Sequence, residues 1–249
     1  MTDPVKTLPY SIDGRLPLYV APVPLDPARH HDRAIVPSAT PFGFAARTPT
    51  ARLTIDEFER AMLDYPIVFF GPQRLPVAVM GLQPDANLFV TEDGRFAPGA
   101  YVPGYLRRYP FVTASLSEEE AVVCIDEQAA CVVSTETEGA VALYDDTEPS
   151  AMLRDIVTLV EAYAAAEVRT EAFGAVLDEY DLLEPRQAHF TGDDGMPQLL
   201  LDYAAVSRGK LAALSPEQLA ALRDNGALPA IYAHLFSAAN WDKLPIWSA

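Results

Sequence analysis

Apolar residues follow two different periods along the chain, and the change comes near residue 148. Before it, short apolar runs alternate with turn sequences such as Gly71-Pro72 and Asp93-Gly94, which is typical of an antiparallel meander. We therefore expect one antiparallel sheet centred on residues 67–133. Its predicted strands are 67–70, 77–82, 87–90 and 111–115, followed by a hairpin over 121–134.

A helix start precedes these strands. Thr54 and Glu57 have the spacing of a capping box, in which each side chain hydrogen-bonds the backbone amide of the other residue. Phe58 and Met62 then lie on one face of a short helix, which Pro66 ends.

After residue 148 the apolar positions recur with the period of a helix. This pattern covers 152–163 and continues over 173–180. Gly174 is about 1 kcal/mol less favourable than alanine inside a helix, so one long helix and two shorter ones both stay open. Pro185 ends the helical pattern.

The remaining C-terminal part reads as one strand and two helices. Residues 187–197 have no regular pattern, and a last strand is expected over 198–206. Ser215, followed by proline, begins a helix that closes at Asn225-Gly226. A final helix is expected over 228–241.

The first 50 residues are rich in proline, which removes backbone donors and predicts an extended arm with short edge strands. Its apolar residues indicate that the arm packs on the body of the protein. The expected fold class is α+β, as a single domain over residues 1–249. It consists of the arm (1–50), a mainly β part (51–147) and a mainly helical part (148–249).

Composition and charge narrow the possible partners. Half of the 249 residues are hydrophobic, which excludes intrinsic disorder. The net charge of −17 repels nucleic acids and anionic membranes and favours a cationic ligand or a basic partner surface. No run of 18 apolar residues occurs, so we expect no membrane span.

The N-terminal segment and the cysteines indicate the compartment. Residues 1–10 lack the basic start and apolar stretch of a signal peptide, which predicts a cytoplasmic protein. Cys124 and Cys131 are expected to face each other across a hairpin whose turn lies between Glu127 and Gln128. In the cytoplasm we expect both thiols to be reduced.

The richest candidate for a binding surface is the segment 99–111, which contains three tyrosines, two arginines and two prolines. Arginine holds carboxylate or phosphate with two parallel hydrogen bonds, and tyrosine offers a flat stacking face. A tightly packed turn is the structural alternative. The candidate binding residues are Tyr101, Tyr105, Arg107, Arg108 and Tyr109.

Arg107 and Arg108 are expected to have different roles. If the segment is extended and Leu106 points inward, alternation along the strand turns Arg107 toward solvent and Arg108 toward the core. An inward arginine in so acidic a chain is expected to meet a carboxylate.

A metal site is the second candidate. His30 and Asp32 have the H-x-D spacing that supplies two ligands of a facial iron triad, with His189 or His234 as the third ligand. The alternative is a solvated loop in the arm, and a buried structural histidine at His234. The chain contains no Gly-rich nucleotide motif or nucleophile elbow. We therefore expect no cofactor and favour a protein without enzymatic activity, while an iron-dependent enzyme stays open as the alternative.

Several segments carry a resemblance to a known family. They include the sequences YPIVF (65–69), NLFV (87–90), YVPGYLRRYPF (101–111), CIDE (124–127) and YAHL (232–235). Gly81-Leu82, residues 211–214 and residues 226–228 follow the same order. On these segments the chain resembles the SapC family of bacterial proteins of about this length.

The resemblance implies a fold and a range of functions. One family member is linked to a crystalline surface layer, and others occur beside flavin-dependent halogenases and cupin-like oxygenases. The resulting hypotheses are an accessory or binding protein, an iron-dependent modifying enzyme that uses His30 and Asp32, and a surface-layer protein. The partner is left open among a small molecule, a peptide, a protein and a second copy of the chain.

Overall fold

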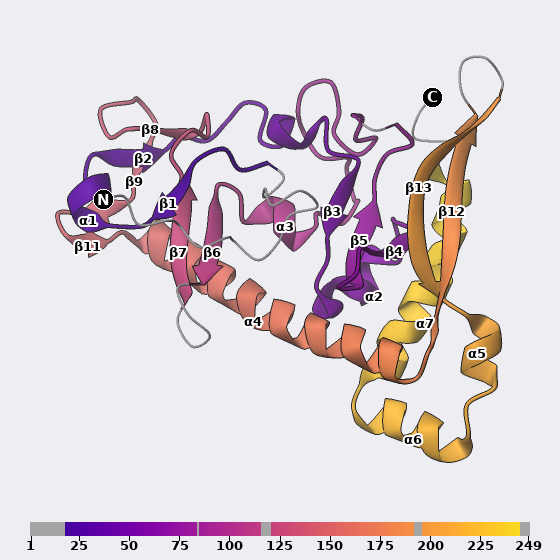
Figure 1. The fold of residues 1–249 in the computed structure, drawn as a ribbon. Helices are drawn as coiled ribbons and strands as arrows, with labels where there is room; N and C mark the ends of the chain where they lie inside the picture. Colours follow the sequence, from indigo (N-terminus) through magenta and orange to yellow (C-terminus); the bar gives the residue numbers. More distant parts are fainter. Residues whose placement is uncertain (1–17, 84, 116–120, 192–195, 245–249) are drawn as a thin grey trace, which may run out of the picture. The chain divides into compact units, whose positions relative to one another are not determined.

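A computed structural model describes residues 18–83, 85–115, 121–191 and 196–244 (Figure 1). Residues 1–17 of the predicted arm lie outside this description. The described chain folds into two compact units, and neither is continuous in sequence. Unit 1 contains residues 18–41 and 108–165, and unit 2 contains residues 42–107 and 166–244. The expectation of a single domain over 1–249 stays a prediction, and each unit is described by itself.

Unit 1 is built from short antiparallel strands. One sheet has the order β1 (Pro22–Pro24), β7 (Ala121–Asp126), β6 (Phe111–Ser115). Another has the order β8 (Val132–Ser134), β2 (Arg33–Ile35), β9 (Val141–Ala142). The strands β10 (Tyr144–Asp145) and β11 (Glu148–Pro149) pair with each other, and the short helix α1 (Pro27–His30) follows β1.

The arm contributes strands, as predicted, but they are not all edge strands. β1 carries prolines at both ends and lies at the edge of its sheet. β2 lies between β8 and β9, so the prediction of edge strands alone is wrong there. Arg33–Ile35 contains no proline, and its backbone is therefore free to pair on both sides.

The predicted cysteine hairpin is wrong. Cys124 lies in β7, opposite Val112 of β6 and Pro24 of β1. Cys131 precedes β8, and β8 pairs with β2 rather than with β7. Both thiols are free, as expected, and burial raises the pKa of Cys124 to about 11. The turn after Asp126 therefore carries the chain from one sheet to another instead of closing a hairpin.

The core of unit 1 is apolar and also holds one arginine. Phe111, Ile125, Leu143, Tyr144, Leu153 and Val160 form its buried cluster. Arg108 is only 2% exposed, and its guanidinium carbon lies 4.2 Å from the centre of the Tyr163 ring. This distance is typical of a cation–π contact.

The opposite orientations of Arg107 and Arg108 are confirmed, but the reason behind the prediction is wrong. Arg107 is exposed and Arg108 is buried. The backbone is not extended here, because Gly104–Arg107 form the short helix α3 and Arg108 lies in the turn that follows. A carboxylate partner for Arg108 stays a prediction.

Unit 2 contains a five-stranded antiparallel sheet. Its order is β12 (Leu183–Thr191), β13 (Pro197–Val206), β4 (Ile67–Phe70), β5 (Leu75–Val79), β3 (Thr50–Arg52). The strand predicted over 67–70 is confirmed. The predicted sheet over 67–133 divides, because β6 and β7 belong to unit 1.

The C-terminal half is less helical than expected. Of the segment predicted to be irregular over 187–197, residues 187–191 belong to β12 and Pro197 begins β13, while residues 192–195 lie outside the described residues. The two strands pair as a long hairpin, in orange in Figure 1. This hairpin joins the sheet through the pairing of Ala204 with Phe69 in β4. Pro185 does not end a helix but lies in β12, an edge strand, where a missing backbone donor is tolerated.

The helices predicted in the C-terminal half are present, together with a further short helix, Arg208–Ala212, that the sequence pattern did not predict. α4 (Ala151–Glu179) is one continuous helix through Gly174. α5 (Arg208–Ala212) and α6 (Pro216–Asp224) follow the hairpin, and Ser215 forms a capping box at the start of α6. α7 (Ala227–Ser237) begins after Gly226, whose φ of +79° favours glycine, and continues into η3 (Ala238–Asp242).

The helix predicted after Thr54 is also present, as η2 (Ile55–Glu57) followed by α2 (Phe58–Ala61). In contrast, residues 87–90 form a loop instead of a strand, with a single bridge from Val90 to Phe96. The side chain of Asn87 donates to the carbonyl of Ala45 and accepts from the amide of Phe89. These side-chain bonds replace a strand ladder. Ala45, which accepts the hydrogen bond from Asn87, belongs to the short helix η1 (Gly43–Ala45).

Helix α7 is hydrogen-bonded directly to the sheet of unit 2. The amide of Ile67 donates to Ser237 Oγ at 2.9 Å, and the amide of Val206 donates to Nε2 of His234 at 3.0 Å. His234 is 4% exposed, and its ring lies 4.9 Å from that of Phe69. Burial lowers the pKa of His234 to about 4, so the imidazole is neutral and Nε2 is free to accept.

The structure confirms the α+β class: antiparallel sheets are combined with a long α4 and C-terminal helices. Among the described helices, none has both the length and the apolar composition needed to cross a bilayer.

The burial of Arg108 leads to a stability prediction. Arg108→Ala should lower the free energy of unfolding by about 2–4 kcal/mol, because it removes a desolvated cation–π contact and leaves a cavity. Arg107→Ala should change it by no more than about 0.5 kcal/mol, as exposed substitutions usually do. Urea unfolding of the two variants measures the difference, and equal losses would contradict the assignment.

The buried His234 leads to a pH prediction. The unfolded chain takes up a proton on this imidazole near pH 6.5, whereas the folded protein does so only near pH 4. The stability present above pH 6.5 should therefore decline as the pH falls toward 4, by up to about 3 kcal/mol from this group. His234→Gln, which keeps an acceptor for Val206, should flatten the decline in urea unfolding. The exposed His189→Gln is the control, and an unchanged slope in His234→Gln would refute the assignment.

Candidate functional site

The carboxylate of Glu57 is the centre of the candidate site. Glu57 is 6% exposed and closes the predicted capping box with Thr54. The backbone N–H and the hydroxyl of Thr54 donate to Oε2, at 2.8 and 3.0 Å. Oε1 accepts from the backbone N–H of Gly104 at 2.6 Å and from the hydroxyl of Tyr101 at 2.9 Å. These donors compensate the loss of water around one carboxylate.

Tyr101 is fixed through its side chain and its backbone. Its hydroxyl donates to Glu57 and accepts a hydrogen bond from Nη2 of Arg107 at 3.2 Å. Its N–H donates to Asp64 Oδ2 at 2.8 Å, and its carbonyl accepts from the hydroxyl of Tyr65. Burial raises the pKa of Tyr101 to about 12, and the charge of Glu57 adds to the rise. The phenol is therefore neutral near pH 7, and its ring is held in one orientation.

A cavity of about 340 Å³ opens beside Tyr101. Arg60, Leu63 and Asp64 line it from helix α2 and the turn that follows, and Tyr101, Val102 and Arg107 line it from the other side. The guanidinium carbon of Arg107 lies 5.7 Å from the centre of the Tyr101 ring. We refer to this cavity as the Tyr101 pocket.

The side chains that line the Tyr101 pocket carry an excess of positive charge, and the carboxylate of Glu57, which is bonded to the Tyr101 hydroxyl, is not among them. The lining has two guanidinium groups and one carboxylate, that of Asp64, which already accepts a hydrogen bond from Tyr101. Within the described ranges, neither Arg60 nor Arg107 forms an ion pair with a carboxylate. Both cations therefore have donors available for an anion in the pocket.

Only two of the five predicted binding residues line this pocket. Tyr101 and Arg107 do so, whereas Tyr105 and Arg108 are buried. The ring of Tyr109 packs in unit 1 against that of Tyr19, with 5.4 Å between the ring centres. The arginine and tyrosine side chains of segment 99–111 are thus divided between a pocket and two packed interiors.

Three residues that build this site are not among the binding residues predicted from the sequence: Glu57, Arg60 and Asp64. Glu57 was identified as a capping residue, but not as the acceptor that fixes Tyr101. Arg60 and Asp64 are four residues apart, a spacing that places two side chains on one helical face. That spacing was the available signal, although nothing local showed that the face meets Tyr101.

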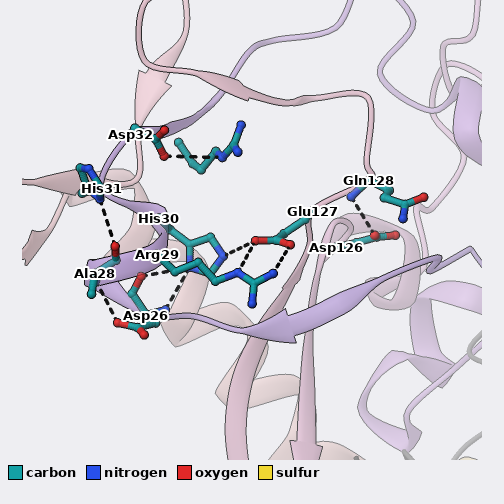
Figure 2. A network of polar contacts seen from close by, with 10 residues as sticks. Asp26, Ala28, Arg29, His30, His31, Asp32, Asp126, Glu127 and Gln128 are labelled. Atoms are coloured by element: carbon teal, nitrogen blue, oxygen red, sulfur yellow. Dashed lines mark hydrogen bonds and ion pairs between the residues drawn. The ribbon is translucent and has the colours of Figure 1, made fainter. Parts of the chain in front are cut away.

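The metal candidates His30 and Asp32 have other contacts in unit 1. Figure 2 shows the imidazole of His30 and the guanidinium of Arg29 pointing at the carboxylate of Glu127. Nε2 of His30 lies 3.1 Å from Glu127 Oε1, and its Nδ1 lies 3.1 Å from both backbone polar atoms of Asp26. The exposed Asp32 forms an ion pair with Arg33 instead, with 3.6 Å between its Oδ1 and Nε of Arg33.

The Arg29–Glu127 pair has the geometry of a two-pronged ion pair, with hydrogen bonds of 2.7 and 2.6 Å. The hydrogen bond from Arg29 is the main reason why the pKa of Glu127 lies below its ordinary value, and His30 adds to the effect. His30 thus forms part of a polar network that joins helix α1 to the turn after β7.

The remaining metal candidates belong to unit 2. His189 is exposed on the edge strand β12, and His234 is buried with Nε2 occupied by Val206. Across the described ranges, no three His, Cys, Asp or Glu side chains gather in a group that would hold a metal ion. The assignment of His30, Asp32, His189 and His234 as ligands therefore gains no support here.

Comparison with known proteins gives one result. A family model described as SapC matches residues 25–244, which is nearly the whole chain. No curated protein and no solved structure has a significant match. The matched region includes the capping box, the Tyr101 pocket and the helices α4 to α7. The chain therefore belongs to the SapC family.

Proposed function

We propose that this SapC-family protein is a binding protein that holds a small organic anion in the Tyr101 pocket. The observation that carries the proposal is the convergence of Arg60 and Arg107, neither paired with a described carboxylate, on a cavity walled by a fixed tyrosine ring. The cavity volume, about 340 Å³, lies at the lower end of the range for small-molecule sites.

The pocket supports binding better than catalysis. Guanidinium groups hold carboxylates through charge-assisted hydrogen bonds but do not exchange protons near neutral pH. The Tyr101 phenol has its pKa raised to about 12, which makes it a poor general base. Leu63 and Val102 add apolar surface beside the ring. A ligand with one carboxylate and a flat apolar body fits this combination.

The acidity of the whole chain makes the two arginines of the pocket more important for anion binding. With a net charge of −17, most of the surface repels an anion. A local excess of positive charge then favours the pocket over other places on the surface. A role beside halogenase or oxygenase systems, and a surface-layer role, remain predictions drawn from the family resemblance.

The expected class of ligand is tested with three compounds that share a phenyl ring and differ in the charge of their polar group. Benzoate should bind the protein in titration calorimetry, whereas benzylamine and benzyl alcohol should bind this pocket at least about tenfold more weakly. Arg107→Gln should weaken benzoate binding by roughly tenfold, because a hydrogen bond to a charged group contributes about 1.5 kcal/mol or more. Arg60→Gln should act in the same direction, and added salt should weaken binding further.

Arg223→Gln is the matched control, since this exposed arginine lies on α6 and does not line the pocket. It should leave benzoate binding unchanged. Equal losses in Arg223→Gln and Arg107→Gln, or tighter binding of benzylamine than of benzoate, would refute the proposal.

The position of Tyr101 gives a separate prediction. Tyr101→Phe keeps the ring but removes a donor to Glu57 and the acceptor for Arg107. It should lower the free energy of unfolding by about 1–2 kcal/mol, because a buried carboxylate loses a hydrogen bond. Benzoate binding should also weaken, since Arg107 loses its anchor. Tyr232→Phe on α7, where the ring is exposed, should change neither quantity in urea unfolding and calorimetry.

A further inference from the structure

Unit 2 contains a second and larger cavity, of about 670 Å³. Its walls come from the η2–α2 segment, from the end of α4 and from the start of α7. It shares no lining residue with the Tyr101 pocket. Because Phe58 and Phe173 supply its aromatic wall, we refer to it as the Phe58 pocket.

The shape of the Phe58 pocket follows from its residue types. Phe58 and Phe173 pack edge to face, with 5.9 Å between the ring centres, and are almost fully buried. Beside these rings, Ala172, Ala227 and Ala230 present only methyl groups, so the helices α4 and α7 leave space between them. The volume falls within the range of about 300–1,000 Å³ for small-molecule sites.

The charged residues at the opening leave an excess of negative charge. Asp56 is paired with Arg169, whose Nη2 lies 2.5 Å from Oδ2 of Asp56. Glu59 lies three residues after Asp56, on the same side of the helix, and is exposed. Among the described residues, Glu59 has no ion-pair partner. The lining thus carries two carboxylates and one guanidinium.

We infer that the Phe58 pocket binds a small organic cation, an amine with an aromatic or branched aliphatic body. The body lies against Ala172, Val176 and Pro229, the lining side chains that keep accessible surface next to the two buried rings. Burial of its apolar surface provides most of the affinity. The ammonium group stays at the opening, where the carboxylate of Glu59 is its counter-ion. The charge of −17 on the chain raises the local concentration of such cations.

This inference is independent of the anion proposed for the Tyr101 pocket. The two cavities differ in lining and in the sign of their excess charge, positive beside Arg60 and Arg107 and negative beside Glu59. Each site can therefore fail its test without affecting the other.

The experiment compares three ligands that share a naphthyl body and differ only in their head group: naphthylethylamine, naphthylethanol and naphthylpropanoate. Binding to the full chain is measured by titration calorimetry at low salt. We expect the amine to bind tightest, about two- to fivefold above the alcohol, because an exposed charge pair contributes up to about that factor. The propanoate should bind this pocket most weakly.

Two variants locate the binding. Ala172→Trp places a large ring in the pocket from an exposed helix position and should weaken amine binding by at least about tenfold. Ala175→Trp, which is exposed on the same helix and does not line the pocket, is its control and should bind the amine as before. Thermal melts verify that both variants are folded.

Glu59→Gln should remove the preference for the amine over the alcohol without changing the binding of the alcohol. Glu179→Gln makes the same charge change at an exposed position outside the pocket and should keep the preference.

Propanoate binding that Ala172→Trp abolishes and that exceeds amine binding would overturn the inference. So would amine binding that is equal in Ala172→Trp and Ala175→Trp, or the absence of binding by all three ligands.

Discussion

The local structure around the candidate site depends on one buried carboxylate. Removing a carboxylate from water costs several kcal/mol unless hydrogen bonds replace the lost solvation. Glu57 meets this requirement with donors from two places in the chain, Thr54 beside it and the segment that contains Tyr101 and Gly104. The acid that caps a short helix therefore also determines where the tyrosine lies, and through the tyrosine where Arg107 lies.

Unit 1 uses a carboxylate in a similar way. Asp126 is fully buried, and its oxygens accept from the backbone amides of Val20, Ala21 and Gln128 at 2.7–3.1 Å. These bonds attach the N-terminal arm to the end of β7. In each unit, a segment distant in sequence is held by backbone donors to one buried acid. Such a contact is directional, whereas apolar packing alone leaves more freedom of register.

The two pockets of unit 2 show how an acidic protein can still discriminate ligands by charge. A net charge of −17 is a property of the whole chain, but a ligand within a cavity interacts mainly with the few charges that line it. The lining of the Tyr101 pocket has an excess of positive charge, opposite in sign to the whole chain, because of its two arginines. The lining of the Phe58 pocket has an excess of negative charge, like the whole chain, because of Glu59. Both cavities flank the segment that Glu57 caps, so their walls rest on the same short helix.

Features that depend on neighbouring residues were predictable from the sequence. The capping box at Thr54, the helix start at Ser215, the left-handed Gly226 and the strand over 67–70 all follow from local hydrogen bonding, backbone freedom or a short apolar run. The α+β class and the SapC family followed as well, because element types and motifs can be read along the chain. Of the candidate site, Tyr101 and Arg107 were identified from their chemistry.

The tertiary structure alone decided which of these elements meet. No pattern of neighbouring residues shows that β7 pairs with β1 and β6 instead of with the segment that contains Cys131. Nor does such a pattern show that the β12–β13 hairpin pairs with β4, which lies more than 100 residues earlier in the chain. Nor does it show that Arg60 faces Arg107 across a pocket while Arg108 is buried against Tyr163. Pairing and burial between distant segments depend on the competition of all apolar and polar surfaces for one core, whereas caps and turns depend on a few adjacent residues. The sequence by itself therefore determined the helix caps, most of the helices and the reactive side chains, whereas the tertiary structure determined how the strands pair and which of those side chains form a site.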